Sequence, residues 1–231
     1  TYRWNAEGTD TFLLRDGDSR TIDIVENGGV ASAQTWDFPS REQCLSCHNA
    51  NAGYVLGVNT HQLNRDRYYP GPGRRLNQLE YLDKTGVFRQ DIGAAAGYRR
   101  AYSIDDNSAD LERRIRSYLD ANCANCHRPG GVTGVDLDLR LSTPLPLQNM
   151  IGAPTRSHAS YPGRRIVQPG DHRASELWVR DAAVDDRRMP PLGSRLVDPV
   201  YIDALAEWID GLPKDRSEEH TSELQSHAPI S

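Results

Sequence analysis

The chain has 231 residues, of which 37% are hydrophobic, and its formal net charge is −5. This length and composition predict one large domain or two small ones with a modest apolar core. No apolar run approaches the length of a membrane-spanning helix, and the weak acidity does not indicate a nucleic-acid partner.

The beginning of the chain has the pattern of short strands and turns. Residues 21–25 (TIDIV) are mostly β-branched, and they lie between the turn sequences DGD at 16–18 and NGG at 27–29. β-branched runs between such turns are typical of strands. We therefore predict a strand at 21–25, followed by Trp36 and Phe38, whose rings either fill a small core or line a cofactor.

The sequence CLSCH at 44–48 has the pattern of c-type haem attachment, in which two thiols bond to the vinyl groups of one haem. The adjacent imidazole then lies below the iron as an axial ligand. We therefore predict thioether bonds at Cys44 and Cys47 and iron ligation by His48. A zinc site or a redox dithiol is the alternative, but zinc sites usually place the histidine several residues from the cysteine pair.

The next part of the chain carries weaker signals. The sequence YYPGPG at 68–73 predicts a loop, because proline and glycine interrupt helices and strands. A short helix is expected to follow, with Asn77 as its N-cap and Gly86 at its end.

Two longer amphipathic helices are predicted in the second half. Apolar residues recur with helical spacing over 111–119, and Asn107 with Asp110 resembles a capping box in front of them. Apolar residues recur in the same way over 201–209, before the stop signal GLP at 211–213. Each helix has one apolar face, so we expect the two to pack on each other.

The first of these helices runs into CANCH at 123–127, a second Cys-x-x-Cys-His motif, and the two motifs use all four cysteines of the chain. We predict thioether bonds from Cys123 and Cys126 to a second haem, with His127 as its axial ligand. The turn RPGG at 128–131 follows. One of its carbonyl groups is expected to accept a hydrogen bond from the outer ring nitrogen of His127.

The second axial ligand is a separate question for each haem. Methionine sulfur is the usual choice in electron-transfer haems, and Met189 lies in a proline-bounded loop (RMPPLG) that could present it to the second haem. Met150 has apolar neighbours, which favours core packing. For the first haem the candidates are His61, Met150, His158 or no protein ligand.

The two ends of the chain carry signals of another kind. Covalent haem attachment belongs to exported proteins, yet the chain begins at Thr1 without a methionine or a signal peptide. We therefore expect a truncated start and a periplasmic or otherwise exported location. Residues 214–231 are expected to form a disordered tail, since the sequence from Arg216 resembles a translated sequencing adapter.

Residues 107–213 resemble a class I cytochrome c, through the first helix, the CANCH motif, the Pro-Gly-Gly turn, the Met-Pro-Pro loop and the closing helix with Trp208. This resemblance implies a helical fold around haem and thioether bonds at both cysteines of that motif. It also implies axial ligation by His127 and Met189.

Residues 1–213 also resemble the haem-bearing C-terminal region of a group of exported bacterial proteins, some of which are joined to a sugar-dehydrogenase-like propeller. The likeness lies in three stretches, WDFPSREQC at 36–44, QLNR at 62–65 and ANC at 121–123. It implies an exported location and an electron-carrying role, without naming a substrate.

Together these signals predict a mainly α fold with a small β-rich N-terminal part. The expected organisation is a β-containing region with the first haem at 1–106, a cytochrome c-like domain with the second haem at 107–213, and the tail. The predicted function is electron transfer by a dihaem c-type cytochrome, from a donor dehydrogenase to an electron acceptor. The alternatives are a dihaem peroxidase-type enzyme with an open first haem, and a haem-dependent sensing module.

Overall fold

The computed structural model describes residues 1–25, 29, 31–155, 163–193 and 195–214. Within these residues 27% lie in helices and 17% in strands, and the strands form three separate two-stranded sheets. The fold is therefore mixed α/β. The prediction of a mainly α chain with a cytochrome c-like helical second half is wrong.

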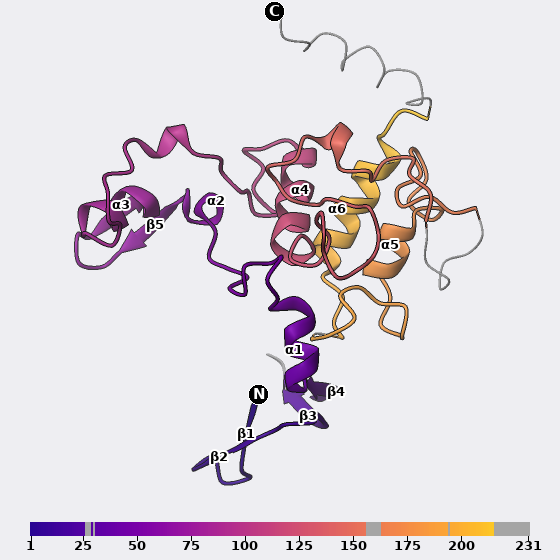
Figure 1. The fold of residues 1–231 in the computed structure, drawn as a ribbon, viewed down its shortest axis with the longest axis horizontal. Coiled ribbons are helices and arrows are strands. Elements are labelled where there is room, and N and C mark those ends of the chain that lie inside the picture. Colours follow the sequence, from indigo (N-terminus) through magenta and orange to yellow (C-terminus); the bar gives the residue numbers. More distant parts are fainter. Residues whose placement is uncertain (26–28, 30, 156–162, 194, 215–231) are drawn as a thin grey trace, which may run out of the picture.

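The strands, in chain order, are β1 (Tyr2–Trp4), β2 (Thr11–Leu13), β3 (Asp18–Val25), β4 (Ala31–Phe38), β5 (Asp66–Tyr69) and β6 (Arg74–Asn77). The helices are α1 (Arg41–Cys47), α2 (Thr60–Leu63), α3 (Gln78–Lys84), α4 (Leu111–Asn122), α5 (Glu176–Asp181) and α6 (Pro199–Asp210). Short 3-10 turns lie at Ala95–Gly97 and Leu145–Leu147. Figure 1 shows α4 and α6 side by side in the centre, with β1 to β4 on an arm below them and α3 with β5 in a lobe to one side.

The N-terminal arm consists of two antiparallel hairpins, β1 with β2 and β3 with β4. The pairing of β3 with β4 starts with Asp18 opposite Phe38 and continues to the end of β3. The strand predicted at 21–25 is thus confirmed, and it begins three residues earlier. Most residues of β3 are exposed, and Trp36 of β4 is 44% exposed. The described part of this hairpin therefore buries little apolar surface.

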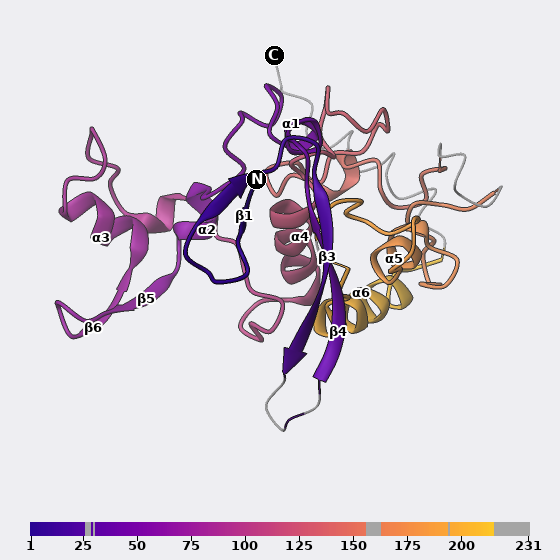
Figure 2. The same ribbon diagram turned by 90° about the horizontal axis from the view of Figure 1, so that it is seen from below.

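The lobe with α3 begins with the hairpin of β5 and β6, which turns at Pro70–Gly73, so the segment predicted as a loop is partly strand. α3 starts as predicted, because the Asn77 side chain accepts a hydrogen bond from the N–H of Leu79 at 2.9 Å. The buried amide of Asn64 anchors the lobe, since its nitrogen donates to three carbonyl oxygens at 95–99 over 2.9–3.2 Å. Figure 2 shows the lobe extending away from α4 and α6.

The helices α4 and α6 share the main apolar core, as predicted from their apolar faces. Ile115 and Leu119 of α4 are completely buried and lie in one cluster with Ile209 of α6. The rings of Tyr118 and Tyr201 stack between the two helices, with their centroids 3.6 Å apart. This pair of helices is the stable centre around which the second half folds.

The N-caps of these two helices are aspartates. The side chain of Asp110 accepts a hydrogen bond from the N–H of Arg113 at 2.8 Å, and that of Asp198 accepts from Tyr201 at 3.2 Å. The predicted cap Asn107 is wrong. Asp110 lies directly before the first helical residue, where a carboxylate reaches the free N–H groups of the first turn.

Helical content is low because the chain between the second motif and α5 does not form α-helix in its described part. It contains turns, a short 3-10 turn and isolated bridges such as the parallel pair Ile151 and Val167. Glycine and proline recur through this segment and interrupt regular structure. The periodicity on which the helical prediction rested is confined to the segments that became α4 and α6.

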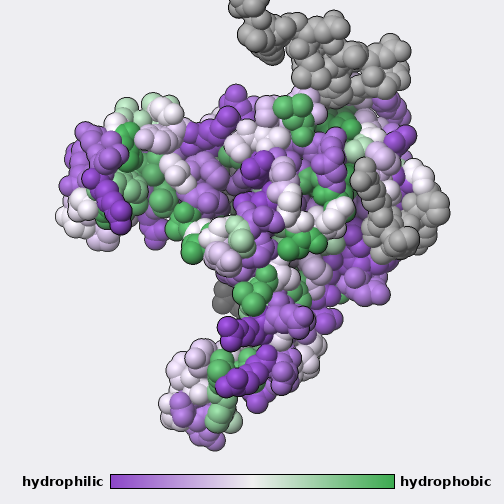
Figure 3. Space-filling model, viewed as in Figure 1, coloured by the Kyte–Doolittle hydropathy of each residue, from purple (hydrophilic) through white to green (hydrophobic). Residues whose placement is uncertain are grey.

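The buried apolar cluster takes all its members from residues 115–212. The apolar residues buried upstream of α4, among those described, are Ala52, Leu79, Ala95 and Ala109. α1 buries none of its residues. Figure 3 shows apolar patches over the N-terminal arm as well as over the body. The N-terminal half therefore presents apolar side chains that are free to contact another group.

The arm reaches the body through an ion pair. Asp37 of β4 lies 2.8 Å from Arg195 and 3.7 Å from Arg188, which directly precedes Met189. No helix within the described ranges is both long and apolar enough to cross a membrane. The described residues end at Lys214, so the predicted tail lies outside them from residue 215 onward.

Candidate functional site

Both Cys-x-x-Cys-His motifs close into one helical turn. In the first, which overlaps the end of α1, the N–H of His48 donates to the carbonyl oxygen of Cys44 at 2.9 Å. In the second, which follows α4, the N–H of His127 donates to the carbonyl oxygen of Cys123, also at 2.9 Å. Residues at i, i+3 and i+4 lie on one face of such a turn. Each motif therefore presents two thiols and one imidazole on the same side.

The two motifs lie side by side, although they are 79 positions apart in the chain. The sulfur atoms of Cys47 and Cys126 are 3.4 Å from each other. This is direct contact, so no group can lie between these two atoms. All four cysteines are free thiols and are partly exposed. The sequence leaves the distance between the two motifs open, and the structure places them in contact.

The loops that follow the motifs also contact each other. The side-chain amide of Asn51 donates to the carbonyl oxygen of Gly130, and Arg128 Nη1 donates to the backbone carbonyl of Asn51 at 3.0 Å. Gly131 keeps this turn tight, because a Cβ atom there would overlap the carbonyl oxygen of Cys126. These contacts fix the second loop against the first.

The imidazole of His48 is oriented by a backbone carbonyl. Its Nδ1 lies 2.8 Å from the carbonyl oxygen of Tyr54, a residue held at a φ of 62°. A carbonyl oxygen can only accept, so Nδ1 carries a proton, and in the neutral imidazole the lone pair is then on Nε2. Metal-binding histidines are typically held in this way. His48 could therefore offer Nε2 to a metal ion.

The imidazole of His127 has a different environment. Its Nδ1 is buried and has no hydrogen-bond partner, so the predicted bond to a carbonyl of the 128–131 turn is wrong. Burial lowers the pKa of His127, and the nearby charge of Arg180 lowers it further. The neutral imidazole is therefore favoured, which is the form that ligates metals.

The thiols of the second motif are held in the protonated form. Burial raises the pKa of Cys126 to about 11; contact with Cys47 acts in the same direction, and Arg128 opposes it. Burial also raises the pKa of Cys123 well above its usual value, with a further contribution from Asp181. Neither sulfur is a ready thiolate at neutral pH, whereas thioether formation adds an S–H group across a vinyl double bond.

A half-buried acid lies beside the second motif. Asp181, at the end of α5, accepts a hydrogen bond from the hydroxyl of Tyr201 at 2.7 Å. Burial raises the pKa of Asp181 to about 7, while that hydrogen bond and the charge of Arg180 act in the opposite direction. The acid and the tyrosine are absent from the predicted site residues, and no sequence pattern marks them.

Met189 lies at the same end of the molecule as His127. Its N–H donates to the carbonyl oxygen of Arg180 at 3.0 Å, and the charge of Arg180 is the one that acts on His127. The Met189 side chain is partly exposed. Its role as an iron ligand stays a prediction.

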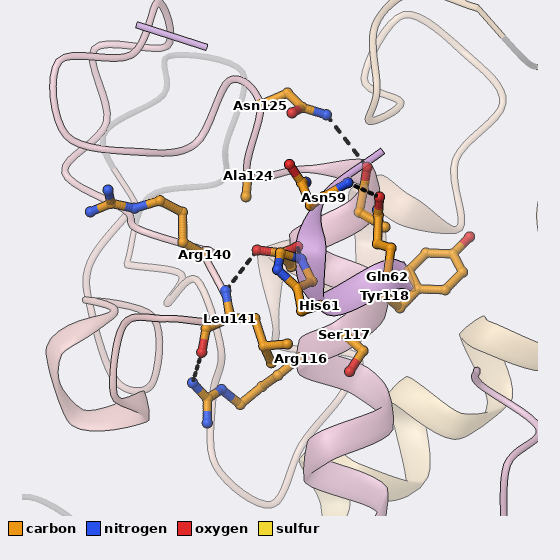
Figure 4. A network of polar contacts seen from close by, with 12 residues as sticks. Asn59, His61, Gln62, Arg116, Ser117, Tyr118, Ala124, Asn125, Arg140 and Leu141 are labelled. Carbon is orange, nitrogen blue, oxygen red and sulfur yellow. Dashed lines mark hydrogen bonds and ion pairs between the residues drawn. The ribbon is translucent and has the colours of Figure 1, made fainter. Parts of the chain in front are cut away.

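The candidate ligands for the first haem are engaged elsewhere or not described. Met150 is 1% exposed within the apolar core, which agrees with core packing. Nε2 of His61 lies 2.5 Å from the buried carboxylate of Asp120, whose other oxygen accepts from the N–H of Leu141 at 2.8 Å. Figure 4 shows His61 and Leu141 in this network beside α4. His158 lies outside the described residues.

A zinc site made of protein side chains is not formed in the described ranges. There, no three side chains of His, Cys, Asp or Glu come close enough together to hold a metal ion.

No family model, curated protein or solved structure matches the chain. The donor set fits a covalently bound haem at each motif, because the thiols are free and His48 keeps Nε2 available. Four exposed apolar side chains lie in or close after the first motif, namely Leu45, Tyr54, Val55 and Val58. A porphyrin attached there would find apolar surface to contact.

Several contacts that organise the site have no signal in the sequence. The acceptor for His48 is the backbone carbonyl of Tyr54, which any residue could supply. The pairing of Asn51 with Gly130 and the contact of Cys47 with Cys126 join segments that are far apart in the chain. Local motifs name the reactive groups, and only the fold shows which of them meet.

Proposed function

We propose that this chain carries two covalently attached haem c groups and relays single electrons between redox partners. The observation that carries the proposal is the repeated Cys-x-x-Cys-His turn, together with the hydrogen bond that fixes the tautomer of His48. The same turn geometry at both motifs supports the same chemistry at both. Haem iron would supply reversible one-electron transfer.

The residues have distinct roles in this proposal. Cys44 and Cys47 hold the first haem and Cys123 and Cys126 the second, each through thioether bonds. The imidazoles of the two motifs would each ligate the iron of their haem. His48 is oriented by its carbonyl contact, and the histidine of the second motif is kept neutral by burial.

Met189 is the proposed second axial ligand at the second motif. Its backbone is fixed to Arg180, and the arm restrains the same loop through the ion pair of Asp37 with Arg188. A sulfur ligand raises the potential of a haem relative to a second imidazole. The proposed partners are a donor dehydrogenase and an electron acceptor, and the proposed location is the periplasm or another exported site.

The test is covalent haem staining. The chain, expressed with an export signal and the c-type maturation machinery, should retain peroxidase-stained haem after denaturing electrophoresis and show two added haem masses. The variant pair Cys44→Ser with Cys47→Ser should keep one haem, as should Cys123→Ser with Cys126→Ser. A colourless wild-type band from folded protein would refute the proposal.

A dihaem peroxidase-type enzyme is the second candidate, and one observation favours it. His61 is paired with Asp120 and Met150 is in the core, so two of the candidates for the second axial position of the first haem are occupied. An open position would permit peroxide chemistry. A high-spin visible spectrum with peroxide turnover supports the enzyme, whereas two low-spin haems support the relay. Carbon monoxide binding without turnover would indicate a sensing module.

A further inference from the structure

The contact between Cys47 and Cys126 joins two motifs that the proposed function uses separately. We infer that these two thiols form a disulfide in the haem-free chain, a covalent cross-link between the motifs that holds back haem attachment. The cross-link can form without haem, but its role in controlling haem attachment rests on the proposed function.

The geometry favours this pair over the pairs within each motif. The two sulfur atoms are 3.4 Å apart, and a disulfide bond is about 2.05 Å long, so a small side-chain movement closes it. The contacts of Asn51 with Gly130 and Arg128 already hold the neighbouring loops together. No large rearrangement is needed.

In the folded chain, the choice between possible disulfides depends on which sulfur atoms are in contact. The structure gives such a contact for Cys47 with Cys126, which are 79 positions apart. An unfolded chain would have to close this long segment at a large cost in entropy, whereas the fold already holds the two sulfur atoms together. The folded chain should therefore prefer the cross-link between the motifs, and the unfolded chain the short rings within them.

The chemistry is thiol–disulfide exchange with an external disulfide, either a protein thiol–disulfide oxidoreductase or a small-molecule disulfide such as oxidised glutathione. One cysteine sulfur attacks the oxidant to give a mixed disulfide, and half of the oxidant leaves as a thiol. The second cysteine sulfur then attacks the mixed disulfide, and the other half leaves as a thiol. The two electrons and two protons of the cysteine thiols pass to the oxidant.

The cross-link takes one thiol from each motif. Neither motif can then form both thioether bonds, so a reductant must open the disulfide before two haems are attached in full. A single redox event would control both sites together, and the cross-link would hold the N-terminal half on the body until a reductant opens it.

The first experiment uses the full chain without haem. The reduced chain is equilibrated with oxidised and reduced glutathione, alkylated, and digested with trypsin for mass spectrometry under non-reducing conditions. The expected dominant product joins the peptide that begins at Glu42 to the one that begins at Ser117. Disulfides confined to single motifs would overturn the inference. In denaturant, the cross-link between the motifs should no longer be the dominant product.

Two double variants identify the sulfur atoms. Cys44→Ser with Cys123→Ser keeps the contacting pair and should still cross-link. Cys47→Ser with Cys126→Ser keeps the other two thiols and should lose the cross-link. Equal cross-linking in both variants would refute the assignment. Circular dichroism of the two reduced variants shows whether each is folded before the comparison.

The regulatory step has its own readout. The pre-oxidised chain and the reduced chain are offered haem and the attachment machinery in parallel, and the pre-oxidised chain should lose double-thioether attachment until reductant is added. Equal attachment without reductant would overturn the control step and leave the mapped disulfide intact. If neither chain takes up haem, the proposed function fails, while the peptide map still decides the cross-link.

Discussion

At the scale of single residues, the carboxyl group of Asp181 combines burial with one strong hydrogen bond. Its burial raises the pKa to about 7, and the hydroxyl of Tyr201 limits the rise because it donates to the charged form. The charge of Asp181 also raises the pKa of Cys123. The protonation state of this acid therefore affects both the stability of the body and the thiol of the second motif.

We predict a pH dependence of stability from this residue. An aspartate in an unfolded chain has a pKa of about 3.9. Between that value and the folded pKa of about 7, the folded protein keeps a proton that the unfolded chain has released, so a rise in pH favours unfolding. The contribution is complete below the unfolded pKa and is lost above the folded one. The free energy of unfolding in urea should fall by roughly 2–4 kcal/mol across this window, since one pKa unit corresponds to about 1.4 kcal/mol.

The matched variants are Asp181→Asn and Asp203→Asn. The first removes the half-buried acid and should flatten the pH dependence. The second changes an exposed aspartate of α6 and should retain the wild-type slope. An Asp181→Asn protein with the same slope as the wild type would contradict the assignment.

The sequence alone identifies the reactive residues of both motifs but not their surroundings. A pattern of five residues names two thiols and an imidazole, because the proposed covalent attachment of haem needs these groups at a fixed local spacing. The carbonyl of Tyr54 and the carboxyl of Asp181 reach the motifs through turns and packing, which leave no local pattern. The predicted acceptor for His127 failed for the same reason.

At the scale of elements, α4 ends with an unusual acid. Asp120 lies in the last turn, where the helix dipole disfavours a negative charge, and it is buried. Its two oxygens face His61 of α2 and the N–H of Leu141. These contacts offset the unfavourable position, and they join α2 and the 141 loop to the central helix.

We predict that Asp120→Ala destabilises the chain more than Asp120→Asn. The alanine leaves the N–H of Leu141 unpaired, which costs about 1–3 kcal/mol, and it also removes the partner of His61. The asparagine keeps an oxygen for the N–H of Leu141, and its amide nitrogen replaces the oxygen that faces His61. Urea denaturation of the two variants measures the difference, and equal free energies of unfolding would contradict this account.

Some helices and strands can be predicted from local sequence signals, whereas others depend on partners far away in the chain. α3, α4 and α6 follow from local signals, such as the Asn77 cap and the apolar spacing of 111–119. The pairing of β5 with β6 was missed because its Pro-Gly turn also fits a loop. The wrong fold class arose from the segment between the second motif and α5, whose bridges depend on distant partners.

At the scale of the whole molecule, buried apolar side chains are distributed unevenly. The apolar cluster lies within 115–212, and the arm and the lobe are attached to it by polar contacts such as Asp37 with Arg195 and His61 with Asp120. Isolated polar contacts of this kind stabilise a fold less than a buried apolar core does. Without haem, the N-terminal half should therefore open at lower free energy than the body.

We predict that trypsin cuts the haem-free chain first in the irregular segment between α3 and α4, at Arg89, Arg99 and Arg100. All three are exposed, and the segment contains only one short 3-10 turn. Arg114 and Arg116 should be cut much later, because they lie in α4 and donate to backbone carbonyls. Mass spectrometry should find a persistent fragment that begins at residue 90, 100 or 101. This result would place the boundary between the two halves near residue 106, the predicted end of the first region.

In the denatured chain all these sites should be cut alike. Early cleavage after Arg114 or Arg116 in the folded chain would show that α4 opens together with the N-terminal half, so that the two form one cooperative unit.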